Sequence, residues 1–214
     1  MIVTIHQPDH LPYLGVLDKI NKADIYVLLD DVDFKKHNFQ NRNKISTKYG
    51  PKWLTIPVKH TRKHINKQEV VAHWKQHYRN KVVEAYRKHP YFEQGITLID
   101  EMLAQDSNLL IDYNMCYLKR ILALLEIKTQ IVASSALNVT TKKSQKLYDI
   151  CERLQATHYL AGSNASSYMD FSLFEGKIQV LNHTHNVPKP YMSSLDFIMC
   201  NGIDELKSVI SKGL

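Results

Sequence analysis

The sequence has little of what marks the more specialised classes of protein. Only 7 of its 214 residues are glycine, which excludes collagen-like and glycine-rich architectures. Its three cysteines show no CxxC spacing, so we expect no disulfide framework and a reducing compartment. No run of eighteen apolar residues occurs, and the first ten residues lack the charged region of a signal peptide. We therefore expect a cytoplasmic protein without a membrane span.

What the chain does contain is an ordinary apolar content and a surplus of positive charge. Hydrophobic residues make up 44% of the sequence and charged residues 23%, a mixture that argues against intrinsic disorder. A chain of this length favours one domain with its own core. The net charge of +7 favours anionic partners, either phosphate-bearing small molecules or nucleic acid. The competing interpretation is a basic surface that is only solvated.

The first thirty residues predict a βαβ unit. Residues 1–5 form a β-branched run, residues 14–21 have helical apolar spacing, and residues 25–29 form a second apolar run. Strands joined by a crossover helix lie parallel, and ligands of parallel sheets bind beyond the carboxyl ends of the strands. His6-Gln7-Pro8 and Asp30-Asp31 follow the two strands, and this placement is the first indication of a functional site.

The rest of the chain adds a basic loop, a block of helices and further strands. Residues 33–52 are polar and basic, and the strand predicted at 53–58 is an edge strand or strand end because of Pro57. A second basic stretch follows at 59–67. We then predict, in order, helices at 74–86, 96–103 and 109–127, a strand at 129–133, a helix beginning at Asn138, strands at 158–160 and 178–181, and helices at 194–199 and 203–210.

This order predicts one α/β domain over residues 1–214. We expect a Rossmann-like parallel sheet that carries a helical insertion at about residues 70–126. The opening strand, turn and helix resemble those of nucleotidylyltransferases of the HxGH type at the level of the fold. In such enzymes histidines and a helix N-terminus hold phosphate oxygens. The sequence lacks the second histidine of that motif, because none follows Gly15, and a simple tight turn is the alternative interpretation.

Several segments match, in order, the motifs of one protein family. IHQPDHLPYLG, ADIYVLLDDVDFKKHNFQNRNKI and WLTIPV are similar to the patterns HQPxxxPxxG, xDxxxxLDDVxFxxxxFxNRNxI and WLTxPV. The similarity continues at Trp74, His77 and Tyr86, and in YLAGSNASSYMD and SSLDFIMCNG. The chain thus resembles the WbqC-like protein family. That family is known chiefly from gene clusters for O-antigen and other surface polysaccharides, so the resemblance implies glycan metabolism without specifying a reaction.

The sequence departs from the family pattern where we expect substrate contacts. His10 stands where a tyrosine or phenylalanine is usual, and Tyr13 stands where a tryptophan is usual. The run Ser163-Asn164-Ala165-Ser166 replaces a loop of small or glycine residues, and HTHNVPKPYM lacks the usual aromatic-rich stretch. These departures leave room for a substrate that differs from those of the polysaccharide members.

The candidate catalytic residues are His6, Asp30 and Asp31. A carboxylate at the carboxyl end of a sheet can hold a metal, orient an amine or act as a general base. Adjacent side chains on a strand point to opposite faces, so we expect one aspartate to enter the site and the other to cap or pair. The competing interpretation pairs the aspartates with Arg42 or Lys44 of the basic loop.

The remaining candidates are assigned to substrate binding. Arg42 stands between Asn41 and Asn43 in the most distinctive motif, and its guanidinium suits phosphate or carboxylate. Backbone N–H groups of the loop at 162–166 could cradle phosphate. Further candidates from strand ends and family positions are Gln7, His10, Lys44, His77, Gly162, Ser163, Tyr168 and Asp196.

Two histidine pairs raise the question of a metal. His73 and His77 are four residues apart on a predicted helix, and His183 and His185 share one face of a strand. Neither pair has an obvious third ligand. We therefore predict no metal site, and the sequence specifies neither a cofactor nor an oligomeric state.

The leading hypothesis is a transferase that acts on a phosphate-bearing or nucleotide-activated acceptor, a sugar in O-antigen or surface-polysaccharide biosynthesis. Asp30 or Asp31 would deprotonate the attacking group, while His6 and the Asn41–Asn43 segment would bind an anion. One alternative is transfer of an amine or amino acid onto a modified base in DNA, and another is a non-catalytic module that binds nucleic acid or a biosynthetic complex. The hypothesis expects His6, Asp30, Arg42 and Asn43 to converge on one cleft.

Overall fold

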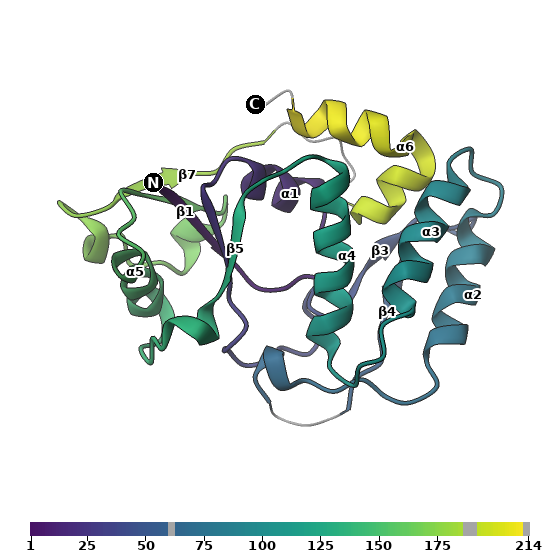
Figure 1. Cartoon of the computed structure of the whole chain (residues 1–214), viewed down its shortest axis with the longest axis horizontal. Helices are drawn as coiled ribbons and strands as arrows, with labels where there is room; N and C mark the ends of the chain where they lie inside the picture. Colours follow the sequence, from purple (N-terminus) through teal and green to yellow (C-terminus); the bar gives the residue numbers. More distant parts are fainter. Residues whose placement is uncertain (60–62, 186–191, 212–214) are drawn as a thin grey trace.

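A parallel sheet forms the centre of the protein. The computed structural model describes residues 1–59, 63–185 and 192–211. Its sheet contains β1 (Ile2–His6), β2 (Ile25–Leu28), β5 (Gln130–Ala133), β6 (His158–Ala161) and β7 (Gln179–Asn182) in the order β5-β2-β1-β6-β7 (Figure 1). Every neighbouring pair is parallel. The predicted Rossmann-like α/β fold is confirmed: successive strands run from β1 to one side, then restart on its other side at β6.

Helices cover both faces of this sheet. On one face α1 (Leu14–Asn21) and α4 (Leu110–Leu124) pack over Tyr26 and Leu28 of β2. On the other face α5 (Lys143–Arg153) and the short helices η3 (Ala165–Ser167) and η4 (Phe171–Phe174) pack over a second cluster that includes Val27. Neighbouring residues of β2 thus enter different cores, because side chains alternate between the faces of a strand. Because both faces of β2 are buried, its sequence is apolar without interruption.

A block of helices lies at the far end of the molecule from α5 (Figure 1). It consists of α2 (Lys75–Tyr86) and α3 (Phe92–Leu103), with α4 between them and the sheet, so helices occupy the stretch predicted at 70–126. The last helix, α6 (Ser194–Ser211), contacts α3 and α1. It is interrupted at Gly202, whose φ of 85° and ψ of 169° are not helical, and this kink separates the two predicted closing helices. A Cβ at Gly202 would lie 2.9 Å from the Tyr91 ring, so the position also requires glycine for space.

The basic loop contains a strand that the sequence analysis missed. β3 (Arg42–Ile45) pairs antiparallel with β4 (Lys52–Thr55) and forms a separate two-stranded sheet. Asn43 is one of the two inward residues of β3, so hydrophobic alternation gives almost no signal over these four positions. The strand predicted at 53–58 was also too long, since β4 ends before Pro57.

The helix predicted from Asn138 begins later, at Lys143. Asn138 instead follows the short helix η2 (Ser134–Leu137) and adopts a left-handed conformation with φ of 53°. Asparagine is among the few residues that tolerate this conformation, so here it ends one helix instead of starting another. One further short helix, η1 (Ile65–Lys67), follows β4.

Parts of two predicted segments lie outside the described residues. These are residues 60–62 of the second basic stretch and 186–191 of HTHNVPKPYM. Within the described ranges, no helix combines the length and apolar character needed to cross a membrane.

Candidate functional site

Three positions form a row at the carboxyl edge of the sheet, where the strand order reverses. β1 ends at His6, β6 is followed by Gly162, and β7 is followed by His183. The register of β1 with β6, continued by two residues, places His6 beside Gly162. The N–H of His183 donates to the carbonyl of Ala161 at 2.8 Å, so the ladder between β6 and β7 also continues. Since neighbouring strands lie about 4.8 Å apart, the His6 and His183 backbones are separated by roughly 10 Å.

Both histidines of this row face the same side of the sheet. His6 pairs with Leu28, which belongs to the core beneath α1 and α4. Paired residues of a parallel ladder point to the same face, so His6 faces that side as well. His183 contacts Asp18, a residue of α1. The edge therefore presents two imidazole side chains next to one helix.

His6 is paired with a carboxylate that the sequence analysis did not single out. Its Nε2 lies 3.0 Å from Oδ2 of Asp9, and the two side chains are 33% and 15% exposed. The available signal was the spacing of three residues across Pro8 in HQPDH. A carboxylate on one ring nitrogen fixes the tautomer of a histidine and leaves the other nitrogen as a proton acceptor. His6 thus has the arrangement of a general base.

Lys19 of α1 lies beneath this pair. Its ammonium donates to the carbonyl of Ile5 at 3.3 Å, and the residue is buried. Burial lowers the pKa of Lys19 to about 8, and the negative charge of Asp9 acts in the opposite direction. Next to the end of β1 there is therefore a buried lysine that loses its proton more readily than a lysine in water.

His183 belongs to a second polar cluster, in which His183 and Asp18 are buried and Lys22 is partly exposed. Its Nε2 lies 2.6 Å from Oδ2 of Asp18, and the ammonium of Lys22 lies 3.0 Å from the same oxygen. Burial by itself raises the pKa of Asp18, but the hydrogen bonds and charges of His183 and Lys22 outweigh it and hold that pKa below its ordinary value. Oδ1 of Asp18 is buried without a hydrogen-bond partner among the described residues. This second pair thus keeps one carboxylate oxygen unused.

Gly162 leaves an open position between the two histidines. No described residue places an atom within 4 Å of a Cβ built at Gly162, and its backbone is outside the left-handed region that favours glycine. The backbone conformation therefore does not require glycine at this position, and no neighbouring side chain fills the space beside it. Ser163 and Tyr168 follow on the same exposed loop. The open position at Gly162 thus lies between the partly exposed His6–Asp9 pair and the buried His183–Asp18 pair.

The polar cluster after β2 is closed. Both carboxylate oxygens of Asp30 accept hydrogen bonds: from the Ser134 hydroxyl at 3.0 Å, from the Ser135 N–H and hydroxyl at 2.9 and 2.7 Å, and from the Asn66 amide at 3.2 Å. Asp30 is buried. These bonds tie the end of β2 to the end of β5 and to η1, so the chain itself occupies the carboxylate predicted to be catalytic.

Asp31 is part of the same closed cluster. It accepts hydrogen bonds from the Ser134 hydroxyl and, at 2.8 Å, from the ammonium of Lys146. Burial raises the pKa of Asp31, but Lys146 and Ser134 outweigh it, so that pKa lies below its ordinary value. The competing interpretation paired the aspartates with Arg42 or Lys44, but the cation that Asp31 contacts is Lys146. Both aspartates accept from the same Ser134 hydroxyl, so they do not point to opposite faces as expected; they lie beyond β2, which ends at Leu28.

Two of the three residues of the asparagine–arginine motif brace the backbone. The amide of Asn41 donates to the carbonyl of Ile56 at 2.9 Å. The amide of Asn43 donates to the carbonyls of His10 and Leu11 at 3.2 and 2.8 Å. Leu11 has a left-handed φ of 45°, so Asn43 stabilises a strained turn between β1 and α1. Both amides are buried, and their contact with substrate stays a prediction.

His10 and Asp196 are also buried residues with partners inside the chain. The ring nitrogens of His10 lie 2.9 Å from the Asn114 amide oxygen and 2.7 Å from the Tyr78 hydroxyl. Burial lowers the pKa of His10 to about 4, against the opposing effects of Asn114 and the charge of Asp9. Asp196 accepts from the Ser46 N–H at 2.7 Å and from the Tyr86 hydroxyl.

The other candidates are dispersed. Arg42 and Lys44 lie on the outer face of the β3–β4 hairpin, and Gln7 accepts a hydrogen bond from the Gln40 amide at 2.7 Å. His77 is exposed on α2, and His73 precedes that helix, so these two are not on one helical turn. The expected convergence of His6, Asp30, Arg42 and Asn43 on one cleft is therefore not what the contacts show.

The start of α1 does not match the phosphate-binding arrangement of nucleotidylyltransferases. A Cβ on Gly15 would lie 2.4 Å from the ring of Tyr13. The Tyr13 ring therefore covers the first turn of this helix, where a phosphate would bind in that arrangement. We conclude that Gly15 is required for ring packing and that phosphate binding at this helix end is not supported.

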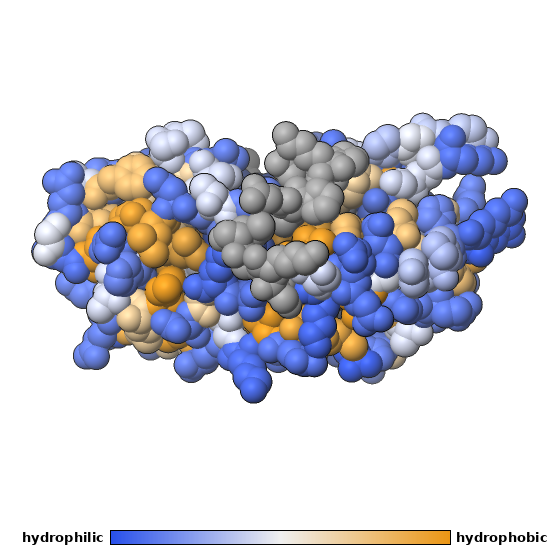
Figure 2. Space-filling view, turned by 90° about the horizontal axis from the view of Figure 1, so that it is seen from above, coloured by the Kyte–Doolittle hydropathy of each residue, from blue (hydrophilic) through white to orange (hydrophobic). Residues whose placement is uncertain are grey.

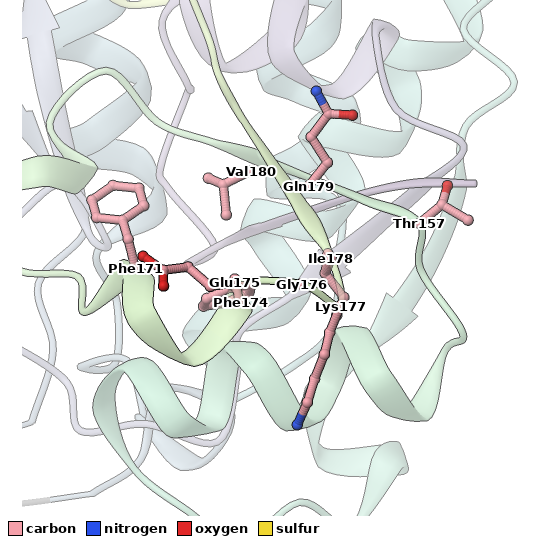
Figure 3. Close-up of a pocket in the computed structure, with 9 residues that line it drawn as sticks. All are labelled: Thr157, Phe171, Phe174, Glu175, Gly176, Lys177, Ile178, Gln179 and Val180. Carbon is pink, nitrogen blue, oxygen red and sulfur yellow. The ribbon is translucent and has the colours of Figure 1, made fainter.

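An open hollow of about 500 Å³ lies away from this row. It surrounds the amino end of β7 and the helix η4, and Figure 3 shows its lining residues, which include Phe171, Phe174, Lys177 and Val180. Hydrophobic residues gather at this end of the molecule (Figure 2). The hollow contains no histidine or aspartate, so its chemistry does not match that of the carboxyl edge.

Comparison with known proteins places the chain in a family. It is 29% identical over 182 residues to the protein named "Uncharacterized protein Rv1507c" of Mycobacterium tuberculosis (strain ATCC 25618 / H37Rv), covering 81% of this chain and 77% of that protein. No solved structure matches the chain. Residues 7–208, which include Asp9, Gly162 and His183, match the model of the WbqC-like protein family. The chain therefore belongs to the WbqC-like protein family.

Proposed function

We propose that the protein is a transferase that acts on a phosphate-bearing or nucleotide-activated acceptor, a sugar in O-antigen or surface-polysaccharide biosynthesis. The observation that carries the proposal is the open position at Gly162 between two histidine–aspartate pairs. It lies where the strand order of the sheet reverses, which is where open α/β sheets bind their ligands.

In this proposal His6 is the general base. Its Nε2–H donates to Asp9, so Nδ1 takes the proton from the attacking hydroxyl or amine of the acceptor. The freed lone pair forms the new bond to the donor, and the leaving group departs with the bonding electrons. Asp9 holds the ring and stabilises the imidazolium that forms. Catalysis is assigned to His6 and Asp9 because the oxygens of Asp30 and Asp31 already bind groups of the chain.

The opposite wall of the gap supplies positive charge. In this proposal the ammonium of Lys22, whose side chain is 24% exposed and pairs with the buried Asp18, attracts the phosphate of a bound substrate. The net charge of +7 acts in the same direction. The proposed site thus pairs a base on β1 with an anion-binding wall next to β7.

Filling the gap tests this proposal. Inorganic pyrophosphate is titrated into the protein by calorimetry, and Gly162→Leu is expected to weaken binding by about tenfold or more, because its side chain occupies the site. Ser166→Leu, an exposed position on the same loop, is the matched control and should bind as the wild type does. Mass spectrometry of mixtures of nucleotide sugars with phosphate-bearing acceptors then reports whether a group is transferred.

Two results would overturn the proposal. One is that pyrophosphate does not bind the wild-type protein, and the other is that Gly162→Leu binds it with unchanged affinity. Thermal unfolding of each variant is measured alongside, so that a loss of binding is not confused with a loss of folding. Gly162→Leu is expected to fold, since no described neighbour lies within 4 Å of the new Cβ.

A further inference from the structure

The outer face of the β3–β4 hairpin carries exposed aromatic rings. We call Phe39, Arg42, Lys44 and Trp53 the hairpin ledge. Trp53 lies on β4 opposite Lys44, while Leu54 on the same strand is buried. Phe39 is 43% exposed and Trp53 is 38% exposed, and their ring centroids are 5.7 Å apart. The burial pattern of the hairpin therefore places its large aromatic side chain on the solvent side, where core packing does not require one.

Two cations accompany these rings. The guanidinium of Arg42 lies 4.1 Å from the centroid of Trp53, and the ammonium of Lys44 lies 5.5 Å from it. Arg42 donates from Nη2 to the carbonyl of His37 at 2.5 Å, but its buried Nε has no hydrogen-bond partner within the described part of the chain. That Nε is buried and is not available to a ligand. What Arg42 and Trp53 present is a guanidinium stacked on a ring, which suits a partner that is both planar and anionic.

The hairpin ledge is connected to the strand-end gap by hydrogen bonds. The backbone carbonyl of Phe39 accepts from the N–H of His10 at 2.8 Å. The next side chain, Gln40, donates to Gln7, the residue that follows His6. The loop that carries the proposed general base and the segment that carries the ledge are thus fixed to each other.

We infer that the hairpin ledge binds the base of a nucleoside diphosphate, as part of a nucleotide-activated substrate whose reacting end lies at His6 and Asp9. This inference rests on the proposed function and narrows its substrate class. A sugar phosphate has no planar ring to stack, whereas every nucleobase does. Arg42 and Lys44 lie beside the stacked base, where their charges attract the diphosphate that the gap at Gly162 binds. The ring planes of Phe39 and Trp53 are tilted by 55° to each other, so the ledge offers no row of parallel stacking faces, which favours one base over a polynucleotide.

Affinity for UDP and ADP, compared with methyl diphosphate, tests this inference. Methyl diphosphate carries the same charge pattern without a base. We expect at least one nucleotide to bind more tightly than methyl diphosphate, and Trp53→Ala to remove that advantage, a loss of about 5- to 100-fold for one stacked base. Trp53→Phe, which keeps a ring, should restore most of it. Tyr49→Ala is the matched control, because Tyr49 is an exposed ring near Lys48 and Lys52 at the hairpin turn.

The outcomes separate this inference from the proposed function. If nucleotides and methyl diphosphate bind equally, or if Trp53→Ala weakens both equally, the ledge does not bind a base, although the gap at Gly162 can still bind diphosphate. If no diphosphate binds at all, the proposed function itself fails. If oligonucleotides bind more tightly than nucleotides, with a steep dependence on salt and a loss in Tyr49→Ala, the hairpin binds a polynucleotide and the inference is overturned.

Discussion

The end of β1 and the end of β2 lie side by side in the sheet and carry similar polar residues, but they differ in what surrounds them. After β2, Asp30 receives four hydrogen bonds from three residues of the same chain. After β1, His6 has one carboxylate partner and an exposed edge, and the neighbouring position is an open glycine. The first region is closed, and the second is open.

The difference shows that a polar cluster at a strand end has two uses. In the closed region the carboxylates hold β2, β5 and η1 together, and a buried carboxylate with all its donors in place stabilises the fold. In the open region a hydrogen bond orients the side chains, but some of their donor and acceptor atoms are left for a ligand, as a binding site requires. The number of partners that the chain itself supplies separates the two uses.

Asp30→Ala provides the largest test of this distinction. We expect the free energy of unfolding to fall by about 3–5 kcal/mol, because the donors of Ser134, Ser135 and Asn66 lose their buried acceptor. Urea unfolding followed by circular dichroism measures the change. Asp33→Ala is the matched control, since its side chain is 88% exposed, and it should change the free energy by less than about 0.5 kcal/mol. Equal effects of the two substitutions would show that the hydrogen bonds of Asp30 do not stabilise the fold.

The fold was more predictable than the site, and the strands show why. β1 and β2 are buried on both faces, so their apolar runs and the helical spacing between them specify a parallel βαβ unit locally. β3 has only four residues and an inward asparagine, and it is held by its pairing with β4. Such pairing depends on residues seven to thirteen positions away, and local periodicity does not record it.

The site depends even more on distant contacts. The sequence identified Asp30 as a candidate, but not that Ser134 and Ser135, about a hundred residues later, would occupy it. Asp9 could have been found from its spacing to His6, whereas the pairing of Asp18 with His183 spans 165 residues. Residue type predicts which chemistry is available, and only the folded chain decides which of those side chains remain accessible.

A substitution at His10 should have an effect on stability between those of Asp30 and His6. His10 lies close to the open region after β1, but its ring nitrogens are already bonded to other residues of the chain. Its pKa is lowered to about 4 by burial, so the unfolded chain binds a proton that the folded chain does not. The contribution of neutral His10 to the free energy of unfolding is therefore fully present above pH 6.5 and is lost as the pH falls toward 4. We expect the free energy of unfolding to decrease by roughly 3 kcal/mol over that range. Urea unfolding at pH 7, 5.5 and 4.5 measures this slope.

A pair of variants assigns the slope to His10. His10→Gln should flatten the pH dependence while lowering the stability at pH 7, because Asn114 and Tyr78 lose well-placed partners. His77→Gln, on the exposed surface of α2, should leave both the slope and the stability unchanged. A slope that survives in His10→Gln would place the titrating group elsewhere.

The smallest expected effect on stability belongs to His6, and it separates the two regions most sharply. We expect His6→Gln to change the free energy of unfolding by less than about 0.5 kcal/mol, because the side chain is partly exposed and glutamine still offers Asp9 a donor. The same substitution should lower group transfer by about 10²- to 10⁴-fold, since the amide cannot accept the proton. Binding of pyrophosphate, measured by calorimetry, should be retained. If His6→Gln instead destabilises the protein as strongly as Asp30→Ala, the His6 side chain holds the fold together as Asp30 does, and the end of β1 is not an open binding site.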